Sequence, residues 1–363
     1  MSGSQPVRFA IVGAGRIARD YTTAFAATAA DAELVAVADT NRDAAHDLAG
    51  AAGLGAERVR GTAAELLAAG GVDAVLLSTP PATHAPIATD LMRGGVSVLC
   101  EKPLCLNTRE AEHLAAEART NGVVFSMATK FRFVEDVAIA KQLVDAGRIG
   151  EVLLFENAFT GHVDMSNRWN SDPALSGGGV LMDNGTHSVD LVRHFLGPIT
   201  AVHALAGPRV QPIPVEDNVL LYCRTASDAM CSIDLSWSFD KSLPTYVSIY
   251  GTRGAIRLGW RGSEIRDDAA GGAWEPFGSG YGKVDAFANQ IRDFAGAVRG
   301  THAPRVSTAD AVASVRVIEA AYASMHGVEA GGWVSTLADG DADTDAGSDS
   351  EAKAVAGSAS GVV

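Results

Sequence analysis

Basic residues, cysteines and long apolar runs are all scarce in this chain, and each shortage excludes a class of protein. No run of about 18 apolar residues is present, so an integral membrane protein is excluded. The 29 Lys and Arg residues against 43 Asp and Glu residues give a net charge of −14, which repels phosphate backbones. We therefore expect neither nucleic acid nor a membrane as a partner.

The cysteines are few and lack the spacing of a metal site. They are Cys100, Cys105, Cys223 and Cys231, with no CxxC pair and no histidine at zinc spacing. We expect buried reduced thiols and no metal. The first residues, Met1 to Val7, show no basic and apolar leader, so we expect a cytoplasmic protein.

What the chain does contain is an α/β pattern in its first third. Its 363 residues predict two domains. Short apolar runs alternate with Ala-rich helical stretches, which is typical of βαβ units around a parallel sheet. The expected strands are Val7–Val12, Glu33–Ala38, Ala74–Ser78, Val96–Cys100 and Val123–Ser126.

After a helical stretch at Val134–Ala146 the periodicity changes. Ile233, Leu235 and Trp237 alternate with polar residues, which predicts a half-buried antiparallel strand. Further strands are expected at Val152–Phe159, Thr200–Ala206, Val219–Arg224, Thr245–Tyr250 and Ala255–Trp260, and helices near Val284–Val298 and Thr308–Met325. We expect domains at residues 1–130 and 131–338, the second of α+β type on an open sheet. Residues 339–363 predict a disordered acidic tail, with an acidic interaction segment as the alternative.

A glycine turn between the first strand and the first helix predicts a dinucleotide site. Its residues are Gly13, Gly15, Arg16 and Ile17. Without side chains at the two glycines, the backbone can approach a pyrophosphate at the helix N-terminus. Asp39 ends the second strand, where a carboxylate accepts hydrogen bonds from ribose hydroxyls and repels a 2′-phosphate. The pattern favours NAD over NADP, with a 2′-phosphate received by Arg42 as the alternative.

Two later strand ends add polar groups to the same crevice. The loop with Thr79, Pro80 and His84 follows the third strand, so we expect it to line the cofactor. A capping or packing role for His84 is the alternative. Glu101 and Lys102 end the fourth strand, and a lysine there could hydrogen-bond a substrate hydroxyl and ease its deprotonation.

The stretch from Gly177 to Asp190 is the most unusual in the chain. Asp183 and His187 are four residues apart, so on a helix they share one face. An imidazole can take the proton of an alcohol while hydride leaves the carbon, and a nearby carboxylate can orient the imidazole or the substrate. The three glycines before them indicate close approach by a ligand or by backbone. A surface Asp and His pair on a helix is the alternative.

Together these motifs resemble the glucose-fructose oxidoreductase and inositol dehydrogenase family, often called Gfo/Idh/MocA. The resemblance covers roughly residues 5 to 335 and rests on Gly13-Ala14-Gly15, Glu101-Lys102-Pro103 and the stretch 177–190. It implies a Rossmann domain, a second domain with an open, predominantly antiparallel sheet, and a homodimer or homotetramer formed through that sheet. It also implies that Lys102, Asp183 and His187 form the catalytic group, with His187 as the acid/base.

We therefore expect an NAD-dependent oxidoreductase that transfers a hydride between the cofactor and a secondary alcohol or ketone of a sugar or cyclitol. Aminocyclitols and nucleotide sugars are included in this substrate class. Further candidates for holding the substrate, beside Asp183 and His187, are Lys130, Arg132, His162 and Arg168. Lys130 departs from what many relatives carry at this point. The resemblance leaves open an NAD-dependent glycosidase or lyase that oxidises transiently, and a non-catalytic NAD-binding regulator.

Overall fold

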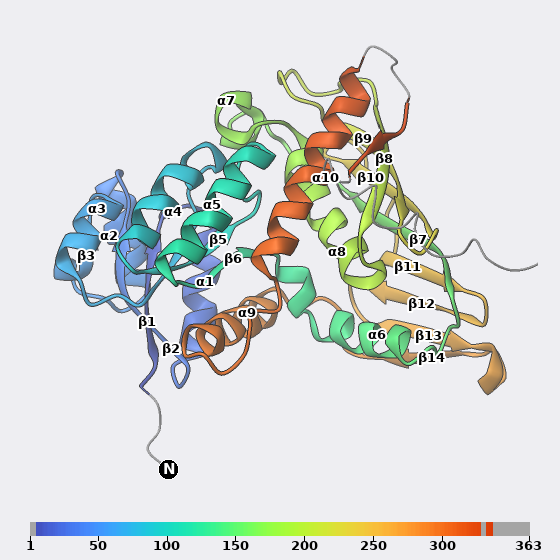
Figure 1. Cartoon of the computed structure of the whole chain (residues 1–363), viewed down its shortest axis with the longest axis horizontal. Helices are drawn as coiled ribbons and strands as arrows, with labels where there is room; N and C mark the ends of the chain where they lie inside the picture. The colour runs from blue at the N-terminus through green and yellow to red at the C-terminus, as the bar shows by residue number, and fades with distance from the viewer. Residues whose placement is uncertain (1–4, 328–331, 337–363) are drawn as a thin grey trace, which may run out of the picture.

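Two β-sheets lie side by side, and one long helix packs against both halves of the molecule. The computed structural model describes residues 5–327 and 332–336, so the predicted tail at 339–363 lies outside the described residues. Figure 1 shows helix α10 (Thr308–His326) between the two sheets. It contacts helix α5 (Thr108–Asn121) of the first half and strand β8 (Ile199–Ala206) of the second. Within these ranges no helix is long and apolar enough to cross a bilayer.

The first domain is a parallel sheet of six strands in the order β3-β2-β1-β4-β5-β6. The strands are β1 Val7–Val12, β2 Ala32–Ala38, β3 Val59–Arg60, β4 Ala74–Leu77, β5 Ser97–Glu101 and β6 Phe125–Ala128. The other helical elements are α1 Arg16–Ala26, α2 Arg42–Ala51, η1 Ala56–Arg58, α3 Ala63–Ala69, η2 Pro81–Thr83 and α4 His84–Arg93. Val12 pairs with both Ala38 and Leu77, so the carboxyl ends of β1, β2 and β4 are level. The predicted Rossmann arrangement is confirmed.

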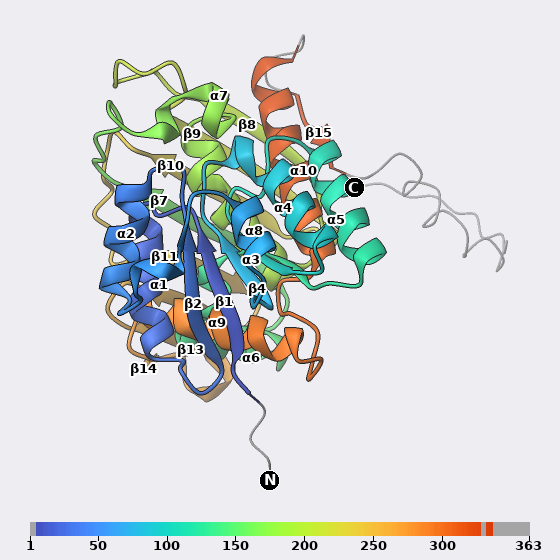
Figure 2. The same cartoon turned by 90° about the vertical axis from the view of Figure 1, so that its left-hand side faces the viewer.

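Both faces of this sheet are covered because successive side chains of its strands point to opposite sides. Phe9 and Ile11 pack in a core with residues of α1 and α2. Ala10 and Val12 belong to the core on the opposite face, with residues of α4 and α5. Figure 2 shows α1 and α2 on one side of β1 and β2, and α4 and α5 on the other. All five predicted strands form, and the two-residue β3 was missed because it is too short to show periodicity.

The second domain is a sheet of nine strands in the order β14-β13-β12-β11-β7-β10-β9-β8-β15. Its further strands are β7 Val152–Thr160, β9 Asn218–Thr225, β10 Met230–Ser236, β11 Thr245–Gly251, β12 Gly254–Gly259, β13 Ser263–Asp267, β14 Trp274–Phe277 and β15 Val334–Ser335. The helical elements are η3 Lys130–Phe133, α6 Glu135–Asp145, η4 Trp169–Ser171, α7 Pro173–Ser176, the π-helical turn η5 Leu181–Gly185, α8 Thr186–Leu196, η6 Asp268–Ala270 and α9 Lys283–Val298.

Every pair of neighbours in this sheet is antiparallel except β7 and β10, so the predicted predominantly antiparallel sheet is confirmed. The sequence missed β13, β14 and β15, which are short. β14 contains Pro276 and lies at the sheet edge, where a missing N–H is tolerated. Helices α6, α8 and α10 contact β12, β7 and β8, so they cover one face.

Helix α9 packs against elements of both halves of the chain. The ring of Phe287 stacks on Tyr21 of α1 with ring centroids 4.1 Å apart, and Phe294 lies 6.0 Å from Phe9 of β1. The same helix also contacts η3. The chain therefore crosses between the two halves more than once, and the predicted division at residue 130 remains a prediction.

Candidate active site

The glycine turn has the geometry of an anion-binding helix N-terminus. Gly13 has φ +101°, and a Cβ there would lie 2.7 Å from the carbonyl carbon of Ser78, so only glycine fits. Gly15 is the N-cap of α1, and a Cβ built on it would meet nothing within 4 Å. Arg16 is exposed and Ile17 half-buried in the first turn of α1. The N–H groups in the first turn of a helix have no partner within the helix, and the open space at Gly15 lets a pyrophosphate approach them.

Asp39 is held in place beside this turn. Its Oδ2 accepts a hydrogen bond from the backbone N of Ala14 at 2.6 Å, and its Oδ1 accepts one from Asn41 N at 2.7 Å. Each carboxylate oxygen keeps a second lone pair, so the pair of ribose hydroxyls of NAD can still be bound. Arg42 Nη2 lies 3.2 Å from Glu65 Oε2, so the cation considered for a 2′-phosphate is already paired.

His84 packs against the loop that carries Thr79 and Pro80, which agrees with the packing role given above as the alternative. It is fully buried, with Nδ1 3.0 Å from the carbonyl oxygen of Pro103 and Nε2 2.7 Å from that of Thr79. Burial lowers the pKa of His84. Thr79 and Pro80 are half-buried at the carboxyl end of β4. His84 therefore joins the loop after β4 to the loop after β5 and is a positioning residue.

Glu101 faces the protein interior beneath the crevice. Its Oε1 accepts a hydrogen bond of 2.8 Å from the phenol of Tyr21, and its Oε2 accepts one of 3.1 Å from the backbone N of Lys102. Burial raises the pKa of Glu101, and the Lys102 ammonium opposes that shift. Tyr21 comes from α1 and was missed by the sequence analysis, because 80 residues separate it from Glu101.

Lys102 and Asp183 meet across the two domains. Lys102 Nζ donates to the carboxylate of Asp183 and also lies 3.3 Å from the Asp183 carbonyl oxygen. Both side chains are largely enclosed, with 16% and 22% of their surfaces exposed. The carboxylate of Asp183 therefore holds the ammonium of Lys102. The expected role of Asp183 in orienting the imidazole or the substrate stays a prediction.

His187 lies in the first turn of α8 against aromatic side chains. Its ring meets Phe131 edge-on at 5.0 Å, and Nδ1 is buried with no hydrogen-bond partner in the described ranges. Burial lowers the pKa of His187 well below its usual value, and the ammonium groups of Lys102 and Lys130 lower it further. The imidazole is thus neutral at neutral pH. Nε2 is the nitrogen left accessible to a substrate.

The three glycines before this group make room for protein atoms rather than for a ligand. A Cβ on Gly179 would lie 1.9 Å from the carbonyl oxygen of Glu216, and one on Gly178 would lie 1.9 Å from the phenol oxygen of Tyr322. The Glu216 carboxylate accepts hydrogen bonds from Gly179 N at 2.9 Å and Tyr322 at 2.7 Å. Gly179 therefore lies against backbone, which is one of the two predicted reasons for close approach, and Gly178 lies against the side chain of Tyr322. Glu216 fixes the entry to η5.

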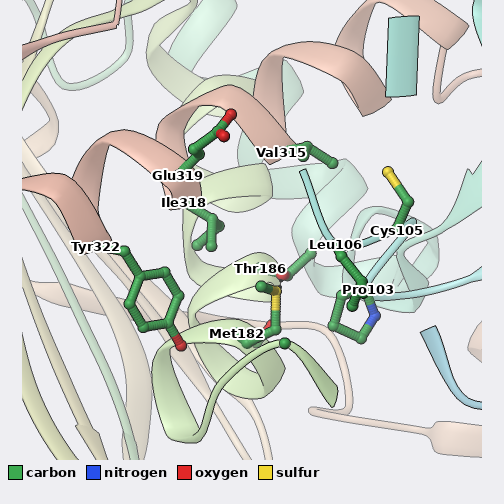
Figure 3. A pocket seen from close by; sticks show the side chains of 10 residues that line it. Pro103, Cys105, Leu106, Met182, Thr186, Val315, Ile318, Glu319 and Tyr322 are labelled. Carbon is green, nitrogen blue, oxygen red and sulfur yellow. Dashed lines mark hydrogen bonds between the residues drawn. The ribbon is translucent and has the colours of Figure 1, made fainter. Parts of the chain in front are cut away.

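A pocket of about 190 Å³ lies between η5, α10 and the loop after β5. Figure 3 shows Met182 and Thr186 facing side chains of α10 and of the loop after β5. Neither Lys102, Asp183 nor His187 lines it. The pocket is therefore separate from the group of residues that can carry chemistry.

Lys130 has an ammonium group enclosed by aromatic rings. Its Nζ lies 5.5 Å from the centroid of Phe131, 5.7 Å from that of Tyr281 and 5.8 Å from that of Phe287. Burial lowers the pKa of Lys130 to about 8, and the charge of Lys102 adds to the decrease. A buried cation with such a pKa disfavours folding, which is typical of residues kept for function.

Replacing Lys130 with Met is expected to raise the free energy of unfolding by about 1–3 kcal/mol at pH 7, because the variant removes a poorly solvated charge. Below pH 8 the lysine is protonated in both folded and unfolded chains, so the full cost applies. As the pH rises above about 8, the folded form loses the proton and the cost declines. Urea unfolding at pH 7 and pH 10 measures the difference, with Lys141→Met on α6 as the control. Equal gains at both pH values would contradict this prediction.

The other expected substrate contacts differ in their surroundings. Arg132 is buried, and its Nη2 lies 2.7 Å from Asp190 Oδ1, so this ion pair joins η3 to α8, and the predicted contact of Arg132 with substrate stays a prediction. The sequence around an arginine does not show whether its guanidinium binds a ligand or a buried carboxylate. His162 is exposed and Arg168 half-buried in the segment after β7, and their predicted contacts with substrate stay predictions.

A dinucleotide-binding fold with an ammonium, a carboxylate and a neutral imidazole at its crevice defines the class of NAD-dependent oxidoreductases. Residues 7–129 match the model of an oxidoreductase family with an NAD-binding Rossmann fold, and residues 137–257 match the GFO/IDH/MocA C-terminal domain. The chain belongs to the GFO/IDH/MocA family.

Relatives and solved structures agree with this assignment. The rhizopine catabolism protein MocA of Rhizobium meliloti is 30% identical over 86% of this chain and 93% of that protein. Inositol 2-dehydrogenase of Rhizobium meliloti (strain 1021) is 29% identical over 88% and 97%. GenD2 from gentamicin A biosynthesis, solved with NAD, is 31% identical with a TM-score of 0.80 over 93% and 98%. Levoglucosan dehydrogenase with NADH shares the fold, with a TM-score of 0.84 at 21% identity over 92% and 100%.

Proposed function

We propose that the protein is an NAD-dependent dehydrogenase that oxidises a secondary alcohol of a sugar, cyclitol or sugar derivative, or reduces the matching ketone. The observation that carries the proposal is the meeting of Lys102, Asp183 and neutral His187 at the carboxyl end of β5. The names of the relatives, which include inositol 2-dehydrogenase and levoglucosan dehydrogenase, support this substrate class. GenD2, from gentamicin A biosynthesis, is a further similar protein that binds NAD.

In this proposal the turn at Gly13 and Gly15 holds the pyrophosphate, and Asp39 holds the adenosine ribose. The nicotinamide, when bound, accepts or returns the hydride. Nε2 of His187 accepts the proton of the substrate hydroxyl, and it can do so at neutral pH because the imidazole is uncharged. The Lys102 ammonium, oriented by Asp183, donates a hydrogen bond to the same oxygen and stabilises its developing negative charge. Lys130 is the substrate contact that we retain from the sequence analysis.

A substrate screen tests the function. Free sugars, cyclitols, aminocyclitols and nucleotide sugars are incubated with NAD, and formation of NADH is followed by absorbance. Stoichiometric NADH with a ketone product supports the dehydrogenase. A bond cleaved without net NADH would instead establish the glycosidase or lyase that acts by transient oxidation. NAD binding without turnover of any compound would point to the regulator.

We further propose a cytoplasmic homo-oligomer formed through the face of the second sheet that α6, α8 and α10 leave uncovered. Leu205 and Leu220 are paired on neighbouring strands and exposed by 45% and 39%, and Met230 is exposed by 63%. Such a set of apolar side chains on one face favours burial against another copy, with closed symmetry giving a dimer or tetramer. The four buried cysteines fit a reducing compartment.

Light scattering is expected to give at least twice the 37.5 kDa of one chain at micromolar concentration. Leu220→Lys should shift the mass toward the monomer because it places a charge in the proposed interface. Val210→Lys, at an exposed loop position, is the matched control and should leave the mass unchanged. A monomeric wild-type protein would refute the interface.

A further inference from the structure

Trp260, directly after β12, is an exposed member of a group of aromatic rings that are otherwise mostly enclosed. We call the group formed by Phe131, Phe159, Tyr246, Trp260 and Tyr281 the aromatic cluster. The indole lies 4.8 Å from Tyr246, 5.6 Å from Tyr281 and 6.3 Å from Phe159, measured between ring centroids. Tyr246 is 1% exposed, whereas Trp260 is 40% exposed. The outermost ring therefore offers a large apolar surface to solvent.

The aromatic cluster connects this surface to the catalytic histidine. Phe131 lies 5.0 Å from the His187 ring and Phe159 lies 6.4 Å from it. Tyr281, which meets Trp260 edge-on, also lies 5.7 Å from the ammonium of Lys130. Trp260 is thus one ring farther from His187 than the inner members. Phe131 and Phe159 are 5% and 8% exposed, so the ring that reaches solvent is the indole and not the rings that contact His187.

The backbone of Trp260 is fixed from both sides. Its N–H donates to the carbonyl oxygen of Pro244 at 3.1 Å, and its carbonyl oxygen accepts from Tyr281 N at 3.2 Å. Gly280 closes the same contact, because a Cβ there would lie 2.6 Å from the Trp260 oxygen. A ring held this way loses little conformational freedom when a ligand covers it, which is the condition for a preorganised binding surface.

The subunit interface proposed above does not account for this exposure. Trp260 packs on Phe159 and follows Leu258, both of which are buried on the face covered by helices. Leu220 and Met230 of the uncovered face belong to β9 and β10, whereas Trp260 follows β12, which β11 and β7 separate from β10. The exposed indole therefore lies outside the proposed interface, and it packs on a ring that contacts His187.

We propose that Trp260 binds a second sugar ring of the substrate, so that the preferred substrates are glycosides of two or more rings. This inference rests on the proposed dehydrogenase function. The C–H face of a six-membered ring can lie flat on the indole and exclude water from both surfaces, while its hydroxyls stay hydrated at the rim. The first ring then places its secondary alcohol at His187, and the second ring supplies binding energy away from the reacting carbon.

Calorimetry on the NADH-loaded enzyme tests this with matched pairs of one-ring and two-ring compounds. The probes are D-glucose with maltose and cellobiose, and 2-deoxystreptamine with its glucosaminide paromamine. In at least one pair the two-ring compound should bind about 10-fold more tightly, the size of one aromatic contact with its buried area. Trp260→Ala should remove that advantage and leave the one-ring affinity unchanged, and Trp260→Phe should keep most of it.

Trp333 provides the matched control, since it is 52% exposed beside His203 near the opposite edge of the sheet. Trp333→Ala should leave the affinities for one-ring and two-ring compounds as in the wild type, although its contact with His203 on the uncovered face lets it change the oligomeric mass. Equal affinities within every pair, or a loss in Trp260→Ala that is the same for one ring and two, would overturn the inference. NADH formation is measured separately with the same compounds. If two-ring compounds are turned over equally well by the wild type and Trp260→Ala, only the second-ring site is rejected. If binding depends on Trp260 but no compound is turned over, only the dehydrogenase function is rejected.

Discussion

His187→Ala is expected to lower kcat by about 100-fold or more while NADH binding stays intact, because the variant removes the group that takes the hydroxyl proton. Nδ1 is buried without a hydrogen-bond partner among the described residues, so Nε2 is the nitrogen that we propose as the base. Steady-state kinetics on the first substrate identified, with NADH affinity from calorimetry, measure both quantities. Circular dichroism must show an unchanged fold, and full activity in a folded variant would reject the role.

Lys102→Met is expected to cause a similar loss through a different route, since it removes the charge that stabilises the substrate oxygen. It also removes one of the two ammonium groups that lower the pKa of His187. The protonated imidazole is inactive as a base, so activity of the wild type should persist well below pH 6.5. In Lys102→Met the acid limb of kcat/KM should therefore move to higher pH. If the acid limb of kcat/KM does not move, Lys102 does not lower the pKa of His187.

Asp183→Asn provides the control for the orienting role. It keeps the size of the side chain and one oxygen toward Lys102 but removes the charge that holds the ammonium. We expect a smaller loss of kcat than in Lys102→Met. A loss equal to that of His187→Ala would instead return Asp183 to a direct part in proton transfer.

Local patterns were sufficient to predict the parts of this site that lie within one strand and the following turn. The positive φ at Gly13 and the position of Asp39 follow from a strand, a glycine turn and a helix, which are neighbours in the chain. The pairing of Lys102 with Asp183 spans 81 residues, and no spacing rule encodes it. The two residues were identified together only through the family resemblance.

Buried polar partners are what the sequence patterns did not predict. Arg132 was a candidate for holding substrate, and the partner that the structure gives it is the fully buried carboxylate of Asp190, 58 residues away. Glu216 and Tyr322, which fix the entry to η5, carry no sequence signal at all. Helix α9 was assigned to the second domain because it follows that domain's strands, and in the structure it packs on α1 and β1 as well as on η3. Long-range contacts decide each of these cases.

The cofactor preference is expected to be at least about 10-fold in kcat/KM for NAD over NADP. Asp39 places a fixed negative charge where the 2′-phosphate of NADP would lie, and juxtaposed like charges cost up to several kcal/mol. The backbone N–H groups of Ala14 and Asn41 hold both carboxylate oxygens, so the side chain cannot easily turn away. Glu65 is paired with Arg42, which keeps that cation from receiving the phosphate.

Asp39→Ser together with Glu65→Gln should reverse or abolish this preference, because the double variant removes the repelling charge and frees Arg42. Asp39→Ser alone should lower kcat/KM for NAD more than it raises kcat/KM for NADP, since the backbone N–H groups of Ala14 and Asn41 lose the carboxylate that accepts their hydrogen bonds. Glu57→Gln, at an exposed position outside this set of contacts, is the matched control for lost negative charge. The measurement is kcat/KM for both cofactors in each variant. Equal kcat/KM for NADP and NAD in the wild type would show that a cation outweighs the charge of Asp39. If the double variant keeps the wild-type ratio of kcat/KM for the two cofactors, neither Asp39 nor Glu65 determines the cofactor preference.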